Sequence, residues 1–361
     1  MKVTVTKYLN VRVGAPSVNA PCYQYLAPGS VLEVDGTMYD GDYYDGSKLW
    51  MKDEAGNYYW AGGVNNPAAV KEPPAAPAVS FNYNQLIQNI PDEWRNAGGK
   101  DIKVIIMDSG VSNVHNDIKI KDENYFDFYY NGNDKYDKCG HGTAIAGLIG
   151  GTAVDNGIRG IAPLCEIISY KVTSNSGATA RLSLMKAIPE INKLAAVNKL
   201  IIVNCSWAVN KSDELDILLK AVPGNVIFVC AAGNNGDLLS ASGALNYPSS
   251  IDRMISVGFI SKDSSELLLS PGKFNSTLDY IFMGSSIKSC DIPAKDSYSD
   301  FDECSMSTAL TSGIITLLVS SVTPDEQLNI DVAFIRNKLN SQLLPLPGSF
   351  TDSLNIYKLK N

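Results

Sequence analysis

Three polar residues, far apart in the chain, have the types needed for nucleophilic catalysis. Asp108 lies in the segment IIMDSGV, His141 in CGHGTAIAG and Ser305 in ECSMSTAL. A serine hydroxyl is a weak nucleophile at neutral pH, so it needs a base within hydrogen-bonding reach and a third group that orients the base. Ser305 would attack a carbonyl carbon, His141 would carry the proton, and Asp108 would hold the imidazole in the required tautomer. The three residues therefore predict hydrolysis of an acyl bond.

Each member of this triad has an alternative interpretation. Asp108 taken alone is typical of an acid that caps the turn after a strand, because Asp-Ser-Gly favours turns. The chain has two histidines, and His115, in the loop after Asp108, is better interpreted as a packing or solvent-facing side chain than as the base. Ser307 is a conceivable alternative to Ser305 in a shifted register. The chain order Asp, His, Ser favours the triad.

The elements that must position these residues follow from the hydrophobic pattern after residue 79. Apolar runs of strand length, such as DIKVIIMD, KLIIVNCSW and NVIFVCAAGN, alternate with helix-like segments such as RLSLMKAIPEINKLAAVN. Strands that are apolar on both faces and separated by helices indicate a parallel sheet covered on both sides. Asp108, Ser206 and Asn234 each fall at the end of such a run, where functional groups gather in α/β sheets.

The chain divides before this α/β part. Residues 66–78, NPAAVKEPPAAPA, are rich in Pro and Ala and predict a semi-extended linker. Residues 1–65 contain short alternating runs punctuated by Gly, Pro, Asp and Asn, which predict a small all-β barrel. Residues 79–361 form the predicted catalytic domain.

Residues 79–361 resemble the subtilisin-like serine proteases, the subtilases of peptidase family S8. The specific matches are Met107-Asp108-Ser109-Gly110-Val111, His115-Asn116-Asp117-Ile118, Gly140-His141-Gly142-Thr143, Gly160-Ile161-Ala162-Pro163 and Tyr170-Lys171-Val172. The resemblance implies a three-layer α/β domain with a mostly parallel sheet. It also implies a serine endopeptidase that works through an acyl-enzyme intermediate.

The nucleophile segment departs from the family pattern Gly-Thr-Ser-Met-Ala-x-Pro. This chain has Glu303-Cys304-Ser305-Met306-Ser307-Thr308-Ala309, so Ser-Met is retained and the Gly, Thr and Pro are absent. The apolar segment that follows predicts a buried helix with Ser305 at its start. A second hypothesis stays open, in which a catalytically impaired pseudoprotease binds peptides or partners.

The resemblance also assigns an oxyanion donor and a substrate-binding surface. The segment Ala231-Ala232-Gly233-Asn234 matches the family's Ala-Ala-Gly-Asn, whose Asn supplies a side-chain amide to the oxyanion hole. Such a donor contributes about 10² to 10³ in rate. The alternative is an ordinary Gly-Asn turn. The implied substrate-binding residues are Ser206, Trp207 and Ala208 on one edge, Ser176 and Gly177 on the other, and Ala231, Ala232 and Gly233 around a P1 pocket with room for an apolar side chain.

Residues 1–65 resemble a bacterial SH3-like domain. The matching residues are Tyr8-Leu9-Asn10-Val11-Arg12, Gly14, Pro16, Trp50-Met51-Lys52, Gly56 and Tyr59-Trp60. This resemblance implies binding of a peptide, a cell-wall fragment or the catalytic domain itself. Because residues 1–65 stand where secreted family members carry a propeptide, regulation of the catalytic domain is a further hypothesis. For Tyr58, Tyr59 and Trp60, a place in the barrel core is favoured over a ligand groove.

Composition excludes several classes of partner. The 361-residue chain has 38 acidic and 30 basic residues, a net charge of −8 and no dense run of Lys and Arg, so we expect no nucleic-acid binding. The longest apolar stretch near the end, residues 313–319, is too short to cross a bilayer, which needs roughly 20 residues. We therefore expect a soluble protein that acts on a protein or peptide substrate.

The cysteines and the N-terminus bear on location and cofactors. The seven cysteines are scattered and include no CxxC pair, which indicates reduced thiols and no zinc site. The N-terminus MKVTVTKYLNVRV lacks the pattern of a secretory signal, which favours the cytoplasm; a signal removed beforehand would instead mean secretion. No cofactor is expected. The family's calcium sites lie in variable loops, so calcium is compatible with the chain at an unknown site.

Overall fold

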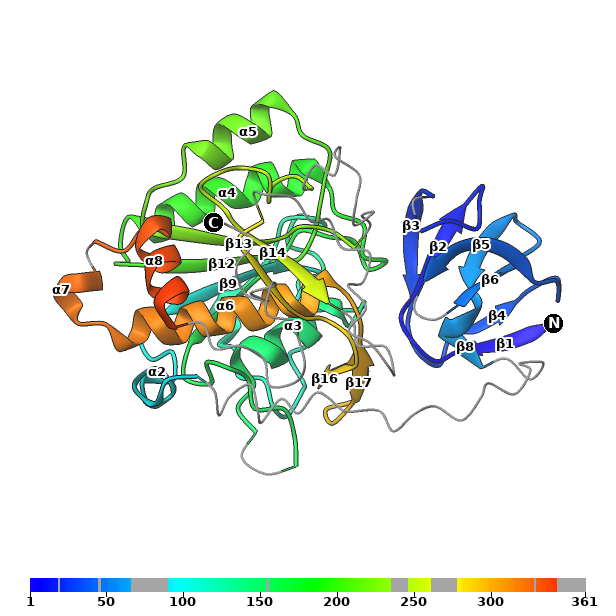
Figure 1. The fold of residues 1–361 in the computed structure, drawn as a ribbon, viewed down its shortest axis with the longest axis horizontal. Coiled ribbons are helices and arrows are strands. Elements are labelled where there is room, and N and C mark those ends of the chain that lie inside the picture. The colour runs from blue at the N-terminus through cyan, green and yellow to red at the C-terminus, as the bar shows by residue number, and fades with distance from the viewer. Residues whose placement is uncertain are drawn as a thin grey trace.

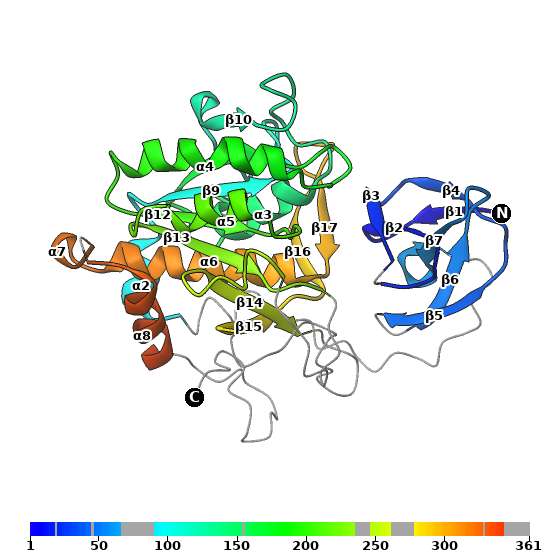
Figure 2. The ribbon, with the colours of Figure 1, turned by 90° about the horizontal axis from the view of Figure 1, so that it is seen from above.

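The structure is a computed structural model. It describes residues 1–18, 20–44, 47–65, 90–153, 156–234, 246–260, 278–327 and 329–342. The predicted linker, residues 66–78, lies outside the described residues. An N-terminal β region (residues 1–65), drawn in blue, lies beside a larger α/β part, drawn in cyan to red (Figures 1 and 2).

The N-terminal β region consists of short antiparallel strands, as its alternating sequence predicts. Its two sheets have the strand orders β3-β2-β7-β6-β5 and β4-β1-β8. The strands are β1 (Lys2–Val5), β2 (Leu9–Val13), β3 (Cys22–Leu26), β4 (Val31–Glu33), β5 (Tyr39–Tyr44), β6 (Ser47–Lys52), β7 (Asn57–Trp60) and β8 (Val64–Asn65), with a 3-10 turn η1 at Ala61–Gly63. Tyr59 and Trp60 are buried and Tyr58 packs against the same core, so the core interpretation of these aromatics is confirmed.

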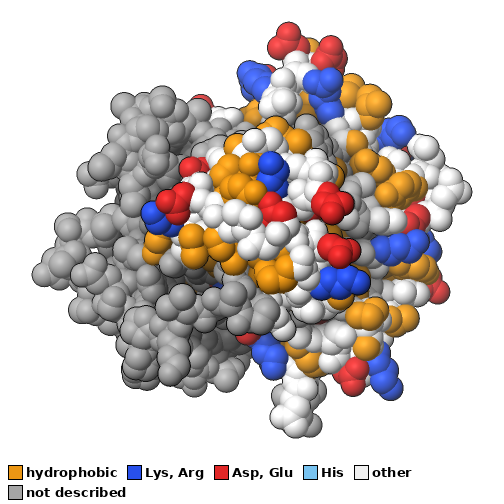
Figure 3. Space-filling view, turned by 90° about the vertical axis from the view of Figure 1, so that its right-hand side faces the viewer, with side chains coloured by type: hydrophobic (Ala, Val, Ile, Leu, Met, Phe, Trp, Pro, Cys, Tyr) orange, Lys and Arg blue, Asp and Glu red, His pale blue; other side chains and the backbone are white. Residues whose placement is uncertain are grey.

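The outer face of the N-terminal β region carries mixed charge. In the view onto this side, acidic, basic and apolar side chains are interspersed (Figure 3). The described part of that face therefore presents no broad basic surface of the kind that tracks a phosphate backbone.

The α/β part is built on a seven-stranded sheet in the order β10-β11-β9-β12-β13-β14-β15, in which every pair is parallel. The strands are β9 (Lys103–Asp108), β10 (Tyr125–Asp127), β11 (Glu166–Lys171), β12 (Ile201–Cys205), β13 (Val226–Ala231), β14 (Ile255–Ile260) and β15 (Tyr280–Met283). Strands β12 and β13 are buried along their whole length, which explains their continuous apolar sequence. The predicted α/β fold with a covered parallel sheet is confirmed.

Helices cover both faces of this sheet (Figure 2). One apolar core contains side chains of α2 (Asp92–Ala97), α3 (His141–Gly150) and α6 (Cys304–Ser321); a second core, on the other face, contains side chains of α4 (Arg181–Ala195) and α5 (Asp213–Lys220). The remaining elements are η2 (Asp122–Asn124), the hairpin β16 (Ile287–Cys290) and β17 (Tyr298–Phe301), α7 (Pro324–Gln327) and α8 (Val332–Gln342). The hairpin lies on the side of the α/β part that faces the N-terminal β region in both views.

Helix α6 is longer than the apolar run that marked it in the sequence. Its 18 residues have a mean hydropathy of 1.4, which by length and composition alone is enough to cross a membrane, unlike the shorter apolar stretch 313–319 within it. Within the protein, 89% of the helix is buried. Its hydroxyl side chains bond back to carbonyl oxygens of the preceding turn, as Thr308 does to Cys304 at 2.8 Å, which lets polar residues lie in an apolar core. Helix α6 is the central core helix of the domain.

Candidate active site

Asp108 and His141 are joined directly. Asp108 is the last residue of β9, and His141 is the first residue of α3. The Nδ1 atom of His141 lies 2.8 Å from Oδ1 of Asp108. The Asp108 side chain is 3% exposed and that of His141 is 25% exposed, so the ring retains access to solvent and substrate. A carboxylate at Nδ1 fixes the tautomer that leaves Nε2 free to act as a base.

Several charges act on the His141 ring. Burial lowers its pKa, but the charge and hydrogen bond of Asp108, together with the charges of Glu303 and Asp137, outweigh burial and raise the pKa to about 9. The protonated imidazolium is therefore well stabilised at this position. That is the state the ring must adopt while it carries the proton of a nucleophile.

Asp137 positions His141 and was missed by the sequence analysis. Its buried carboxylate accepts hydrogen bonds from the backbone N–H groups of Cys139, Gly140 and Thr143 at 2.8, 3.0 and 3.0 Å, and from the Thr143 hydroxyl at 2.6 Å. Burial raises the pKa of Asp137, although these hydrogen bonds act to lower it. The N-cap of α3 is Gly140, so Asp137 lies outside the position where a capping acid is recognised, and no local sequence signal identifies it.

Ser305 lies at the start of α6, as predicted, and is 5% exposed. Its hydroxyl donates to the carbonyl oxygen of Ser206 at 3.3 Å. Within the described part of the chain this is the hydrogen bond that the Ser305 hydroxyl makes, and His141 is not its partner. A hydroxyl rotates freely, and catalytic hydrogen bonds in substrate-free sites are often absent or long.

Asn234 lies three residues beyond the end of β13 and faces the start of α6. Its Oδ1 atom accepts the backbone N–H of Cys304 at 2.9 Å, which directs its side-chain NH₂ group away from that N–H. Asn234 and Ser305 line the same cavity as Asp108 and His141. The four predicted catalytic residues therefore come together in space.

This cavity has a volume of about 520 Å³ and contains most of the predicted substrate-binding residues. The predicted residues that line it, besides the four catalytic ones, are Gly177, Ser206, Trp207, Ala208, Ala231 and Gly233. Ala232 is fully buried beneath the cavity wall, where its N–H donates to the carbonyl of Val257, so it does not line the cavity. Ser176 also lies outside the lining, and its carbonyl oxygen accepts the N–H of Tyr25 from the N-terminal β region.

The N-terminal β region forms part of the same cavity. Tyr25 on β3 donates its backbone N–H to the carbonyl of Ser176 at 3.2 Å, and its ring lies against Gly177, where an added Cβ would be 2.5 Å from Cδ2. Gly177 has φ of +82°, so a larger residue there would be both strained and in collision with the ring. Strand β3 is the strand nearest to the catalytic domain in both ribbon views.

A second contact lies beside the His141 helix. The Tyr8 hydroxyl donates to Oδ1 of Asp291 at 2.6 Å, and its ring stacks on Phe301 with centroids 5.1 Å apart. The same hydroxyl lies so close to Gly140 that a Cβ there would collide with it. Burial and the Asp291 carboxylate both raise the pKa of Tyr8. No local sequence pattern predicts that Tyr8 pairs with Asp291 and Phe301.

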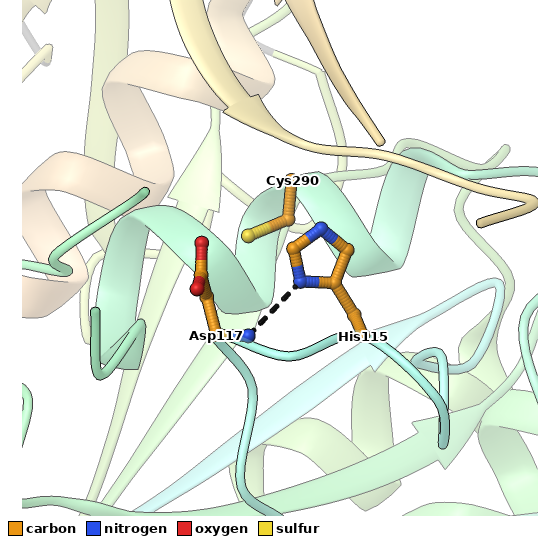
Figure 4. Close-up of side chains that lie close together, drawn as sticks. All are labelled: His115, Asp117 and Cys290. Carbon is orange, nitrogen blue, oxygen red and sulfur yellow. Dashed lines mark hydrogen bonds between the residues drawn. The ribbon is translucent and has the colours of Figure 1, made fainter. Parts of the chain in front are cut away.

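One group of described side chains has the composition of a metal site: His115, Asp117 and Cys290 (Figure 4). Its atoms are already in use. The Nδ1 atom of His115 accepts the N–H of Asp117 at 3.2 Å and Nε2 lies 2.9 Å from the Ser297 carbonyl, while Oδ2 of Asp117 accepts the Tyr298 hydroxyl at 2.7 Å. The cluster is a hydrogen-bonded part of the core, and buried His115 has the packing role that was the favoured alternative.

Comparison with known proteins identifies the family of the α/β part. Residues 99–341 match the model of the subtilase family, peptidase S8. The chain is 31% identical over 281 residues to the major intracellular serine protease of Bacillus subtilis, covering 74% of this chain and 85% of that one. It is 28% identical over 271 residues to the intracellular serine protease of Paenibacillus polymyxa, covering 73% and 80%.

Solved structures give the same result for the fold. A cold-adapted subtilisin-like serine proteinase matches with a TM-score of 0.55 and 25% identity, over 73% of this chain and 89% of that one. Sphericase matches with a TM-score of 0.55 and 22% identity, over 70% and 90%. With a parallel sheet, a match over residues 99–341 and relatives named as serine proteases, the chain belongs to the subtilase family of serine proteases, a family of hydrolases.

Proposed function

We propose that the protein is a serine endopeptidase that uses Asp108, His141 and Ser305 as its triad and Asn234 as an oxyanion donor. The observation that carries the proposal is the 2.8 Å contact between His141 and Asp108, in a cavity that also contains Ser305 and Asn234. Each residue type suits one step of peptide hydrolysis.

The reaction would proceed in two stages. The Ser305 hydroxyl attacks the peptide carbonyl while Nε2 of His141 accepts its proton, and Asp108 stabilises the imidazolium. The NH₂ group of Asn234 and the N–H of Ser305 at the start of α6 donate to the negatively charged oxygen. His141 then protonates the leaving amine. A water molecule, deprotonated by the same ring, releases the acyl group from Ser305.

A fluorophosphonate probe tests this assignment on the full chain. Intact mass measurement should show one adduct on the wild-type protein and none on S305A. The matched control is S307A, because the Ser307 hydroxyl is buried and bonded to the carbonyls of Gly258 and Cys304 at 3.0 and 2.8 Å. S307A should label like the wild type, and loss of labelling in S307A alone would move the nucleophile to Ser307. No adduct on any of these proteins or on Y25A would favour the pseudoprotease.

The N-terminal β region is proposed to bind the catalytic domain itself, as an intramolecular ligand of the substrate edge. The bond from Tyr25 to Ser176 supports this, because an extended substrate is held by the same kind of main-chain pairing. The Tyr8–Asp291 hydrogen bond and the Lys7–Asp302 ion pair, at 3.8 Å, support a defined interface. A free peptide or a cell-wall fragment would compete for the same region.

A cytoplasmic location is proposed on two grounds. Two of the relatives are named intracellular serine proteases. All seven cysteines are free thiols, four of which lie fully or nearly fully buried in the sheet and helix core: Cys205, Cys230, Cys290 and Cys304. Fractionation of the native host, followed by detection of the protein with an antibody, tests the location.

A further inference from the structure

A lysine lies fully buried beside the catalytic aspartate. Lys171 is the last residue of β11, and it is in register with Asp108 on the neighbouring strand β9. Burial lowers the pKa of Lys171, although three nearby aspartates act to raise it. An ammonium group inside a protein is stable only where hydrogen bonds and opposite charges replace water. The partners of Lys171 therefore show which parts of the chain it holds together.

The Lys171 ammonium group joins two loops. It donates to the carbonyl oxygen of Tyr136 at 2.7 Å and to Oδ1 of Asn175 at 2.6 Å. Its Nζ atom also lies 3.8 Å from Oδ2 of Asp134. The loop of Tyr136 carries Asp137, the acid that accepts hydrogen bonds from the start of α3. The loop of Asn175 is the turn that follows β11 and contains the predicted substrate edge.

Asn175 is held from outside its own turn. Its Oδ1 atom accepts from Lys171, and its NH₂ group donates to Oδ2 of Asp134 at 2.8 Å. Because an ammonium group can only donate and a carboxylate can only accept, these two partners allow one orientation of the amide. The backbone N–H of Asn175 donates to the hydroxyl of Tyr130 at 3.1 Å. Both the side chain and the backbone of Asn175 are therefore fixed.

The residues that follow Asn175 form the substrate edge. The turn is closed by the N–H of Ser174, which donates to the carbonyl of Ala178 at 2.9 Å. Between them, Gly177 lines the catalytic cavity, and the carbonyl of Ser176 accepts a main-chain N–H from β3. Main-chain pairing with an extended ligand requires carbonyl and N–H groups that already point in the right direction. The position of Asn175 sets that direction from one end of the turn.

We propose that Lys171 is a positioning residue for substrate binding, which acts through Asn175 to hold the turn 174–177 in the conformation that pairs with an extended peptide. Lys171 itself touches neither the substrate nor the reacting atoms. Since the same ammonium group binds the loop that carries Asp137, the substrate edge and the start of the His141 helix are fixed to one point. This inference rests on the proposed function, because it concerns the substrate edge of the same site.

Two kinds of reactant separate the edge from the reacting centre. An extended hexapeptide amide needs the edge, whereas a fluorophosphonate probe with a short alkyl chain needs only Ser305 and the groups around it. Since β3 occupies the edge, all variants are compared as full chains in the Y25A background. We expect N175A and K171M each to raise KM for the hexapeptide about 10-fold, the contribution of one or two main-chain hydrogen bonds. The kcat value and the labelling rate should not change.

Two further variants complete the test. K193M is the matched control, because Lys193 on α4 is exposed and pairs with Glu190 at 2.7 Å, away from the edge. It should leave KM, kcat and the labelling rate unchanged. The double variant K171M/N175A should have the KM of the single variants and no more, because the two side chains act through one hydrogen bond. Thermal melting shows whether each variant is folded.

The outcomes are distinguishable. An unchanged KM in N175A overturns the inference on Lys171. Equal losses of labelling and of peptide hydrolysis in K171M also overturn it, because the lysine would then act on the fold or on the reacting centre. Additive effects in the double variant overturn it as well, since the two residues would then act separately. If K171M does not fold, N175A decides the result, because it removes the acceptor that connects Lys171 to the edge.

Failure of the proposed function gives a different result. Absence of labelling in the wild type, in Y25A and in every variant overturns the assignment of Ser305. The Kd of the hexapeptide for the full chain in the S305A/Y25A background then decides the inference on Lys171, because it depends on the edge and not on the chemistry. This Kd should rise about 10-fold in N175A, and an unchanged Kd overturns the inference.

Discussion

The backbone N–H of Tyr25, on β3 of the N-terminal β region, lies 3.2 Å from the carbonyl oxygen of Ser176, in the turn that follows β11 of the α/β part. Ser176 was predicted to lie on an edge that pairs with an extended substrate. The contact therefore places the N-terminal β region on the edge that is predicted to bind substrate. The first experiment therefore asks whether removing the contact speeds the hydrolysis of peptides.

Replacing Tyr25 with alanine should raise kcat/KM for peptide substrates several-fold. The ring packs on Gly177, so its removal weakens the contact between β3 and the substrate edge without touching the triad. Hydrolysis of a quenched fluorescent peptide library measures the effect. Y43A is the matched control, because Tyr43 on β5 is 59% exposed and should not change the rate. Equal rates for Y25A and the wild type would contradict a covering role for β3.

Activity should rise with pH up to about pH 9, because His141 acts as a base only when neutral and its pKa is raised to about 9. The same ion pair with Asp108 stabilises the fold. That contribution is complete below the ordinary pKa of 6.5 and is lost as pH rises through about 9. Rates of Ser305 labelling between pH 5 and 10 measure the dependence of activity on pH.

In D108N the rise of labelling rate with pH should move to lower pH, and the rate should fall about 10⁴-fold. An unchanged pH profile of labelling would show that Asp108 does not act on the His141 ring.

Replacing Asp137 with alanine should destabilise the protein by about 3 kcal/mol, since buried donors of the His141 helix lose their acceptor. The labelling rate of Ser305 should fall as well, because the first turn of α3 carries His141. D137N should retain part of both properties, since its amide oxygen can accept some of these bonds. Urea unfolding and labelling give the two values. If D137A has the same free energy of unfolding as the wild type, Asp137 does not stabilise the start of α3.

The ion pair of Lys103 and Glu166 supplies a control away from the site. Their Nζ and Oε2 atoms are 2.6 Å apart, and the hydrogen bond from Lys103 outweighs burial and, with Asn124, lowers the pKa of Glu166 to about 2. Because folding lowers the pKa of Glu166, its ionised carboxylate stabilises the fold above the ordinary pKa of 4.5. This stability is lost as pH falls through about 2. E166Q should therefore lower the melting temperature at pH 7 and leave it unchanged near pH 2. Labelling of Ser305 at pH 7 should not change.

Much of the site could be predicted because its residues lie at the ends of locally encoded elements. The apolar runs that become β9 and β13 place Asp108 and Asn234 at one edge of the sheet, and the segment after Gly140 begins a helix with His141. Strand and helix patterns are local, so these positions follow from the sequence. The assignment of each residue to a catalytic role remains a prediction until the variants are measured.

The rest depends on contacts between distant segments. The stacking of Tyr8 on Phe301 and the bond of Tyr25 to Ser176 join parts of the chain that share no local pattern. The apolar stretch 313–319 is shorter than α6 because it stops where serines and threonines count as polar, whereas in the helix their hydroxyls bond to carbonyls one turn earlier. The missing glycine at Glu303 was visible in the sequence, but the backbone conformation that Glu303 adopts, with φ of 148°, was not.

The covalent connection between the N-terminal β region and the catalytic domain changes how their contact responds to dilution. Two surfaces on one chain meet at an effective concentration that is on the order of millimolar for short flexible linkers and does not depend on how much protein is present. An interface whose Kd lies well below that concentration therefore forms within one chain, even in solutions too dilute for separate molecules to associate. Lowering the protein concentration would not open the substrate edge, whereas a competing ligand for the N-terminal β region or a cut between the two parts would.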